Sequence, residues 1–180
     1  MAVKTLLRLA SGKRWGKLLF EALVIVAIVV AVQLWQTRGL PAGEAPPLSG
    51  ALLDGSQLSL VDVLVAAGGK PVLVAFWATW CAVCKAEAGG LDAIAADRQV
   101  VAVATNSGSA ADVRKYLAER GRTLPTVNDA DGQLAMAWRV QGLPTHFVID
   151  ARGHVRFRVV GYATEWGLRA RLWWAEKFAG

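Results

Sequence analysis

Residues 70–84 read KPVLVAFWATWCAVC, and this stretch decides the fold. It contains a continuous apolar run, PVLVAFW, which is typical of a strand that is buried on both faces of a sheet. The residues that follow, CAVCKAEAGGLDAIAAD, have the composition of a helix, and the glycine pair Gly89-Gly90 is where a kink is expected. The sequence therefore predicts a buried strand that passes directly into a helix, with Cys81 and Cys84 at the junction.

The rest of the chain continues this alternation of strands and helices. Ser109 is a capping residue and marks the start of a predicted helix. The other predicted elements after the first helix are strands over 99–105, 145–150 and 154–160 and helices over 109–120 and about 165–178. Strand–helix–strand–helix followed by a hairpin and a terminal helix predicts an α/β sandwich around a mixed sheet.

The amino-terminal segment is apolar over residues 18–35, LLFEALVIVAIVVAVQLW. As a helix it would span about 27 Å, close to the ~30 Å hydrocarbon core of a bilayer. Trp15 and Trp35 bracket it, as interfacial aromatic residues do. Five basic residues precede it, and they are Lys4, Arg8, Lys13, Arg14 and Lys17. By the positive-inside rule, the amino terminus is cytoplasmic and the residues after Trp35 lie across the inner membrane, in the periplasm or its equivalent.

A cleaved signal peptide is the alternative to an uncleaved anchor. The residues that follow the apolar run, VQLWQTR, are bulky or polar and lack the small-residue pattern of a cleavage site, which favours the anchor. The predicted division is a basic cytoplasmic head over 1–17, a transmembrane anchor over 18–35, a Pro/Gly/Ala linker over 36–49 and a domain over 50–180. The linker is expected to hold no regular element.

The charge distribution argues against a nucleic-acid partner. The net charge of +6 comes mostly from the basic head, and the remaining 15 basic and 14 acidic residues nearly cancel. A nucleic-acid-binding domain would carry a basic patch on its folded part.

The two cysteines of the chain, Cys81 and Cys84, are placed where a helix begins. Unpaired backbone N–H groups and the positive end of the helix dipole favour a thiolate at that position. A second thiol about one turn away can resolve a mixed disulfide. A structural disulfide across so small a loop would stabilise the fold poorly, and a zinc site needs about four ligands. A two-thiolate Cu(I) site stays open as an alternative, because soft thiolates suit that ion.

The segment AFWATWCAVC, residues 75–84, resembles the active-site signature of the thioredoxin superfamily, and GLPT, residues 142–145, resembles its cis-proline loop. The similarity extends over about residues 46–180 and includes the Asp-x-x-Gly of Asp129 to Gly132. With an anchor before the domain, the chain looks most like the TlpA-like (ResA-like) thiol–disulfide oxidoreductases, and within them like the suppressor-of-copper-sensitivity D proteins. The resemblance implies a thioredoxin-like three-layer sandwich with a central mixed sheet.

The resemblance also assigns roles by position. Cys81 would be the attacking thiol and Cys84 the resolving one, while the Leu143–Pro144 bond would be cis. The residues implied to contact substrate are Trp80, Leu143, Pro144 and Thr145. Core packing is the alternative for Trp80.

Glu87 stands three residues after Cys84, where TlpA-like proteins commonly carry an acidic residue. A partly buried carboxyl there could accept the proton of Cys84, whereas an ordinary solvated glutamate on the helix face is the equal alternative. Thioredoxin has a buried aspartate where this chain has Ala75, so a proton acceptor must lie elsewhere. His146 is expected to pack or to face solvent.

The implied function is exchange of electrons with exported protein thiols and disulfides. Thr145 after the proline favours a reductase over an oxidase. Apocytochromes c and copper-handling proteins are typical clients of the resembled group, and a membrane electron-transfer protein usually resets its members. No nucleotide, haem or flavin motif is visible, so neither a cofactor nor a metal is predicted; the alternative function is a non-enzymatic Cu(I) carrier that uses the same two thiols.

Overall fold

The computed structural model describes residues 2–179, with side chains from Trp15 onward. The chain divides into an amino-terminal unit that ends at Arg38 and a second unit that begins at Gly39. The first unit is the helix α1 (Ala2–Gln36). Its segment Trp15–Gln36 is long and apolar enough, by length and composition, to cross a membrane.

The second unit is built on a six-stranded mixed sheet in the order β1-β8-β7-β4-β5-β6. Its strands are β1 (Gly43–Glu44), β4 (Val72–Trp77), β5 (Val100–Thr105), β6 (Thr126–Asp129), β7 (Thr145–Ile149) and β8 (His154–Val160). β4, β5 and β6 run parallel, whereas β7 pairs antiparallel with both β4 and β8. The central strands β4 and β5 are buried along their whole length, as their unbroken apolar sequences predict. A separate two-stranded sheet joins β2 (Ser49–Ala51) to β3 (Gln57–Ser59).

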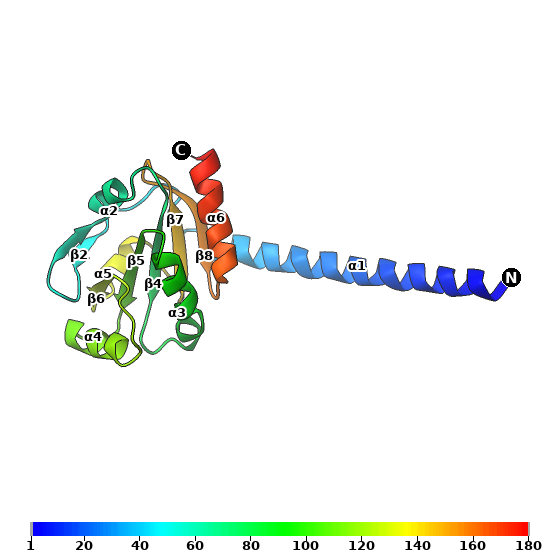
Figure 1. Ribbon diagram of the computed structural model, residues 1–180, viewed down its shortest axis with the longest axis horizontal. Coiled ribbons are helices and arrows are strands. Elements are labelled where there is room, and N and C mark those ends of the chain that lie inside the picture. The colour runs from blue at the N-terminus through cyan, green and yellow to red at the C-terminus, as the bar shows by residue number, and fades with distance from the viewer. Residues whose placement is uncertain (1, 180) are drawn as a thin grey trace. The chain divides into compact units, whose positions relative to one another are not determined.

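Helices cover both faces of the large sheet and give three layers (Figure 1). On one face, α2 (Leu60–Ala66) and α5 (Gln133–Ala137) close a core whose centre is Trp138 against Phe76 and Phe147. On the other face lie α3 (Ala82–Ala95), α4 (Ala110–Ala118) and α6 (Glu165–Phe178), which bury Leu91, Ile94, Leu168 and other apolar residues. The predicted α/β sandwich is therefore present, and it is a thioredoxin-like fold.

Two local expectations differ from the structure. The segment expected to be an unstructured linker holds β1. Gly43 and Glu44 have low strand propensity, but their backbone atoms pair with β8. α3 runs through the glycine pair without interruption, and a Cβ at Gly90 would lie 3.3 Å from that of Glu165, so Gly90 allows close approach of α6. Trp166, Trp173 and Trp174 of α6 are at least 42% exposed, and Trp174 packs edge-to-face on Phe157 of β8.

The Asp-x-x-Gly motif has a structural role. Asp129 is buried at the end of β6, where its carboxylate accepts hydrogen bonds from the Thr105 hydroxyl and from the backbone N–H groups of Leu134 and Ala135. Gly132 adopts φ +73° at the start of α5, a left-handed conformation that favours glycine. The motif therefore fixes β5, β6 and α5 together near the end of the sheet that carries the cysteines.

Candidate active site

The two cysteines form a disulfide at the amino terminus of α3. Cys81 is the N-cap residue of this 14-residue helix, and its Sγ accepts a hydrogen bond of 3.1 Å from the backbone N–H of Cys84. Both residues are buried, with 7% and 3% of their surface exposed. A thiolate at Cys81 would keep this N–H and would face the positive end of the helix dipole, so the position favours ionisation of that sulfur.

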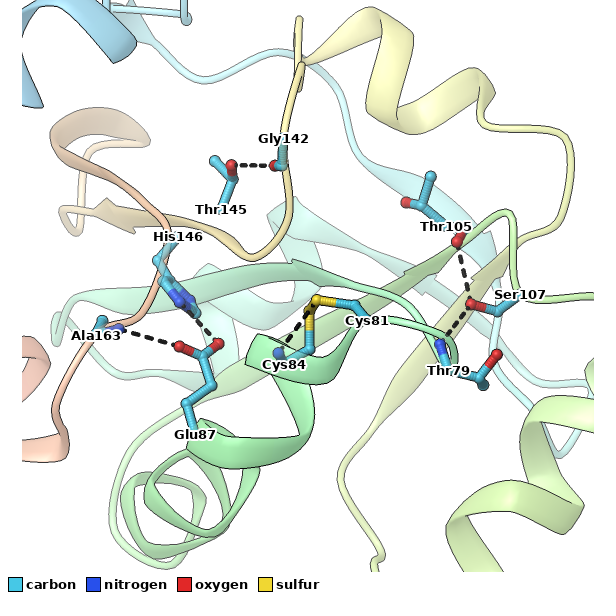
Figure 2. Close-up of a disulfide and its surroundings, with 10 residues drawn as sticks. All are labelled: Thr79, Cys81, Cys84, Glu87, Thr105, Ser107, Gly142, Thr145, His146 and Ala163. Carbon is cyan, nitrogen blue, oxygen red and sulfur yellow. Dashed lines mark hydrogen bonds and ion pairs between the residues drawn. A yellow bond between two sulfur atoms is a disulfide. The ribbon is translucent and has the colours of Figure 1, made fainter. Parts of the chain in front are cut away.

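The loop between β4 and α3 is held by the end of β5. The backbone N–H of Thr79 donates to Ser107 Oγ at 3.1 Å, and this hydroxyl donates in turn to the Thr105 carbonyl at 3.0 Å (Figure 2). Trp80 Nε1 donates to the carbonyl of Asn106 at 2.9 Å. These bonds fix the approach to Cys81 from a neighbouring parallel strand. Ser107 and Asn106 carry no local signal of this role, because their partners are remote in the chain.

The Leu143–Pro144 peptide bond is cis, as the resemblance implied. Thr145 Oγ1 donates to the Gly142 carbonyl at 2.7 Å, and the Pro144 carbonyl accepts the N–H of Gly161 at 2.8 Å. Thr145 opens β7 opposite Phe76 of β4, which brings the proline loop beside the strand that leads to the cysteines (Figure 2). Within residues 2–179 the backbone of Leu143 has no hydrogen-bond partner.

Trp80 lies on the surface beside the disulfide. Its side chain is 63% exposed, so the alternative of core packing is wrong for this residue, whereas Trp77 is buried. A hollow of about 700 Å³ lies between Trp80 and Leu143, and the exposed side chain of Met136 also lines it. Trp80 and Leu143 therefore border an open, partly apolar surface. Pro144 and Thr145 are buried, so the substrate contact expected of these two side chains is not open to the surface.

Glu87 is not a solvated helix-face residue. It is 4% exposed, its Oε2 accepts the backbone N–H of Ala163 at 3.1 Å, and its Oε1 lies 3.0 Å from Nε2 of His146 (Figure 2). His146 is completely buried, so the expectation that it packs, rather than facing solvent, holds; its contact with Glu87 was not anticipated. The sequence carries no local signal of this contact, because it depends on the register that places His146 opposite Ala75 in the sheet.

No group of three or more His, Cys, Asp or Glu residues within the described part of the chain is arranged to hold a metal ion.

Comparisons with known proteins agree with this geometry. The family model of the AhpC/TSA family matches residues 41–158. The thiol:disulfide interchange protein DsbE of Escherichia coli is 31% identical over 172 residues, which cover 87% of this chain and 89% of that protein. The chain belongs to the AhpC/TSA family. It is a DsbE-like thiol:disulfide oxidoreductase, and Cys81 and Cys84 are its Cys-x-x-Cys pair.

Two further relatives of this DsbE-like chain illustrate the range of the similarity. A thioredoxin-like protein of Haemophilus influenzae is 38% identical over 110 residues, which cover 61% of this chain and 65% of that protein. A crystal structure of a thiol:disulfide interchange protein from Chlorobium tepidum superposes with a TM-score of 0.63 at 28% identity, and the match covers 76% of this chain and 97% of the other. The likeness of the second unit to solved structures thus extends over nearly the whole of that fold.

Proposed function

We propose that the chain is a membrane-tethered disulfide reductase, in which Cys81 attacks substrate disulfides and Cys84 resolves the mixed disulfide. The observation that carries this proposal is the hydrogen bond from the Cys84 backbone N–H to Cys81 Sγ at the amino terminus of α3. It favours the thiolate of Cys81 over that of Cys84, which supports Cys81 as the nucleophile and leaves Cys84 as the resolving thiol.

Substrate would be bound as an extended segment across Trp80 and the cis-proline loop. The unpaired backbone of Leu143 offers main-chain hydrogen bonds, and the exposed indole of Trp80 offers an apolar wall on the other side of the disulfide. Pro144 and Thr145 are buried and shape the loop that presents Leu143. Because main-chain pairing reads no side chain, this surface suits several exported proteins with disulfides.

The proposed location follows from the amino-terminal helix. Its basic residues precede the apolar stretch, which supports a cytoplasmic head over 1–17, a membrane anchor over 18–35, a connecting segment over 36–49 and a catalytic domain over 50–180 across the inner membrane, in the periplasm. Apocytochromes c or copper-handling proteins would be the substrates, and a membrane electron-transfer protein would restore the dithiol. Within the TlpA-like proteins, the chain would belong to the suppressor-of-copper-sensitivity D group. Retention in the membrane after carbonate extraction, with labelling of reduced Cys81 by an impermeant maleimide in intact cells, tests this arrangement.

The chemical part of the proposal is tested with purified full-length protein in detergent, with insulin as substrate and dithiothreitol as electron source. Cys81→Ser should abolish turnover, whereas Cys84→Ser should stop after one attack and accumulate a covalent adduct at Cys81. Ser56→Ala, a change at an exposed site, serves as the control. Turnover that survives in Cys81→Ser contradicts the proposal, and tight Cu(I) binding without turnover in the wild type would favour a carrier instead.

A further inference from the structure

Glu87 and His146 form a buried ionisable pair under the active site. Their side chains are 2% and 0% exposed, and Glu87 Oε1 lies 3.0 Å from His146 Nε2, although the contact is not aligned as a hydrogen bond. Glu87 is on α3 and His146 on β7, so the pair joins the helix that carries the cysteines to the strand that follows the cis-proline (Figure 2). Glu87 is also one helical turn beyond Cys84, a spacing that puts both side chains on one face of α3.

The surroundings of the pair are apolar. His146 lies opposite Ala75 of β4 and Val159 of β8, both of which are buried. The ionisable residues on the elements packed around the pair are Lys85 and Asp92 on α3, Glu165, Arg169, Arg171, Glu176 and Lys177 on α6, and His154, Arg156 and Arg158 on β8. Asp92 pairs with Arg122, Glu165 with Arg169, and Glu176 with Arg98, while His154 and Arg156 both lie against Asp150. Arg158 donates to the Leu40 carbonyl and Arg171 to the Gly167 carbonyl, and Lys85 and Lys177 are exposed. Within the described residues, His146 is therefore the one ionisable group in contact with Glu87.

This burial restricts how protons are distributed over the pair. A carboxylate with one amide donor and no second polar neighbour is costly in an apolar site. A proton on His146 Nε2 gives Oε1 that second neighbour. His146 Nδ1 has no partner among residues 2–179, so a second ring proton would be a buried donor without an acceptor. The arrangement with the fewest unpaired groups is a Glu87 carboxylate beside a singly protonated imidazole.

We propose that His146 is a positioning residue, which orients the Glu87 carboxylate so that Glu87 can take the proton of Cys84 during resolution. This inference rests on the proposed function and on Cys84 as the resolving thiol. Cys81 thiolate first attacks a disulfide R–S–S–R, forms Cys81–S–S–R and releases R–S⁻. The Cys84 thiol then gives its proton to the Glu87 carboxylate, and the Cys84 thiolate attacks Cys81 Sγ. The intramolecular disulfide forms, the second R–S⁻ leaves, and two electrons have passed to the substrate.

Charge balance supports this route. Before transfer, the buried region holds one negative charge, on Glu87; afterwards it holds one, on the Cys84 sulfur. His146 does not change its own protonation in this step. It orients Glu87 Oε1 before the transfer, and the same contact is present again once Glu87 has released the proton. Ala75, opposite His146, has no polar side-chain atom. The polar groups beside the cysteines are therefore the carboxylate of Glu87 from α3 and the imidazole of His146 from β7.

The two attacks can be timed separately with an aromatic disulfide, dithiobis(nitrobenzoate), which releases one coloured thiolate in each step. Reduced full-length protein in detergent is mixed with a stoichiometric amount of the reagent in a stopped-flow instrument. His146→Leu should leave the first release within about twofold of wild type and slow the second about tenfold or more at pH 7, because general-base assistance is typically worth 10²–10⁴. The deficit should shrink as the pH rises, since hydroxide can then deprotonate Cys84 directly.

Four comparisons make the result decisive. His146→Gln keeps an N–H donor for Oε1, so its second rate should be closer to wild type than that of His146→Leu. Glu87→Gln should slow the second release as well, and adding His146→Leu to it should cause no further loss. His154→Leu, at a histidine whose side chain is 43% exposed, should leave both releases unchanged.

An unchanged second release in His146→Leu, a deficit that is equal at every pH, or a full additional loss in the double variant would each overturn this inference. If wild-type protein instead gives a first release no faster than a free thiol, or no second release, the proposed function itself fails. The two failures are therefore separate results of one experiment.

Discussion

Replacing Ser107 by alanine is expected to loosen the loop that presents Cys81. Among the described residues, the Thr79 N–H donates a hydrogen bond to the Ser107 hydroxyl alone. The same hydroxyl donates to the Thr105 carbonyl. Leaving a partly buried donor unsatisfied costs about 1–3 kcal/mol, and because Thr79 is only partly buried, water can replace some of the bond. We therefore expect a loss of about 1–2 kcal/mol in the free energy of unfolding.

A loss of this size lowers the melting temperature by about 2–8 °C for a protein of this length, since 1 kcal/mol corresponds to ~2–4 °C. Thermal unfolding of the oxidised full-length protein in detergent measures it, and amide hydrogen exchange of Thr79 should become faster. Ser56→Ala, where the hydroxyl bonds Asp54 on the surface, is the matched control and should stay within about 0.5 kcal/mol of wild type. Equal melting temperatures for Ser107→Ala and the control, with Thr79 exchange unchanged, would refute the reasoning.

Three further changes test the core, the substrate surface and the acid stability. Trp138→Ala removes a side chain with no exposed surface and should cost about 3–5 kcal/mol, measured by urea unfolding; a cost below ~1 kcal/mol would contradict its central place. Trp80→Ala should keep the melting temperature but raise the KM for a peptide disulfide, because the indole is on the surface; an unchanged KM would remove it from substrate binding. Burial raises the pKa of Asp150, but the N–H of His154, the Arg156 side chain and the N–H of Arg152 together bring that pKa below its ordinary value. The stabilisation that this lowered pKa gives is present above about pH 4 and is lost as the pH falls through the folded-state value. Asp150→Asn should therefore be less stable than wild type at pH 7, and its free energy of unfolding should change less with pH below pH 4. Parallel pH profiles for the two proteins would contradict this.

Much of the fold could be predicted because β4 and β5 are unbroken apolar runs and because Ser109 and the hairpin after Asp150 carry local signals. β1 could not be predicted, because its two residues have low strand propensity and form a strand only by pairing with the backbone of β8.

The active site shows the same division between local and distant information. The cysteines stand at a strand-to-helix junction, which the sequence displays directly, and the cis bond at Pro144 followed from a motif. The pairing of Glu87 with His146 depends on how α3 lies against β7, and neither residue has a neighbour in the sequence that points to the other. Buried ionisable pairs of this kind need the register of the sheet before they can be found.

The most direct test of the account is the pH dependence of alkylation at Cys81 in the Cys84→Ser variant, which has a single thiol because the chain has two cysteines. Iodoacetamide consumption by the full-length protein in detergent gives the rate at each pH. The account predicts a midpoint at least about one pH unit below the ~8.5 of a free cysteine, because the helix terminus stabilises the thiolate. A midpoint at or above that of a free cysteine would contradict the claim that this site activates Cys81.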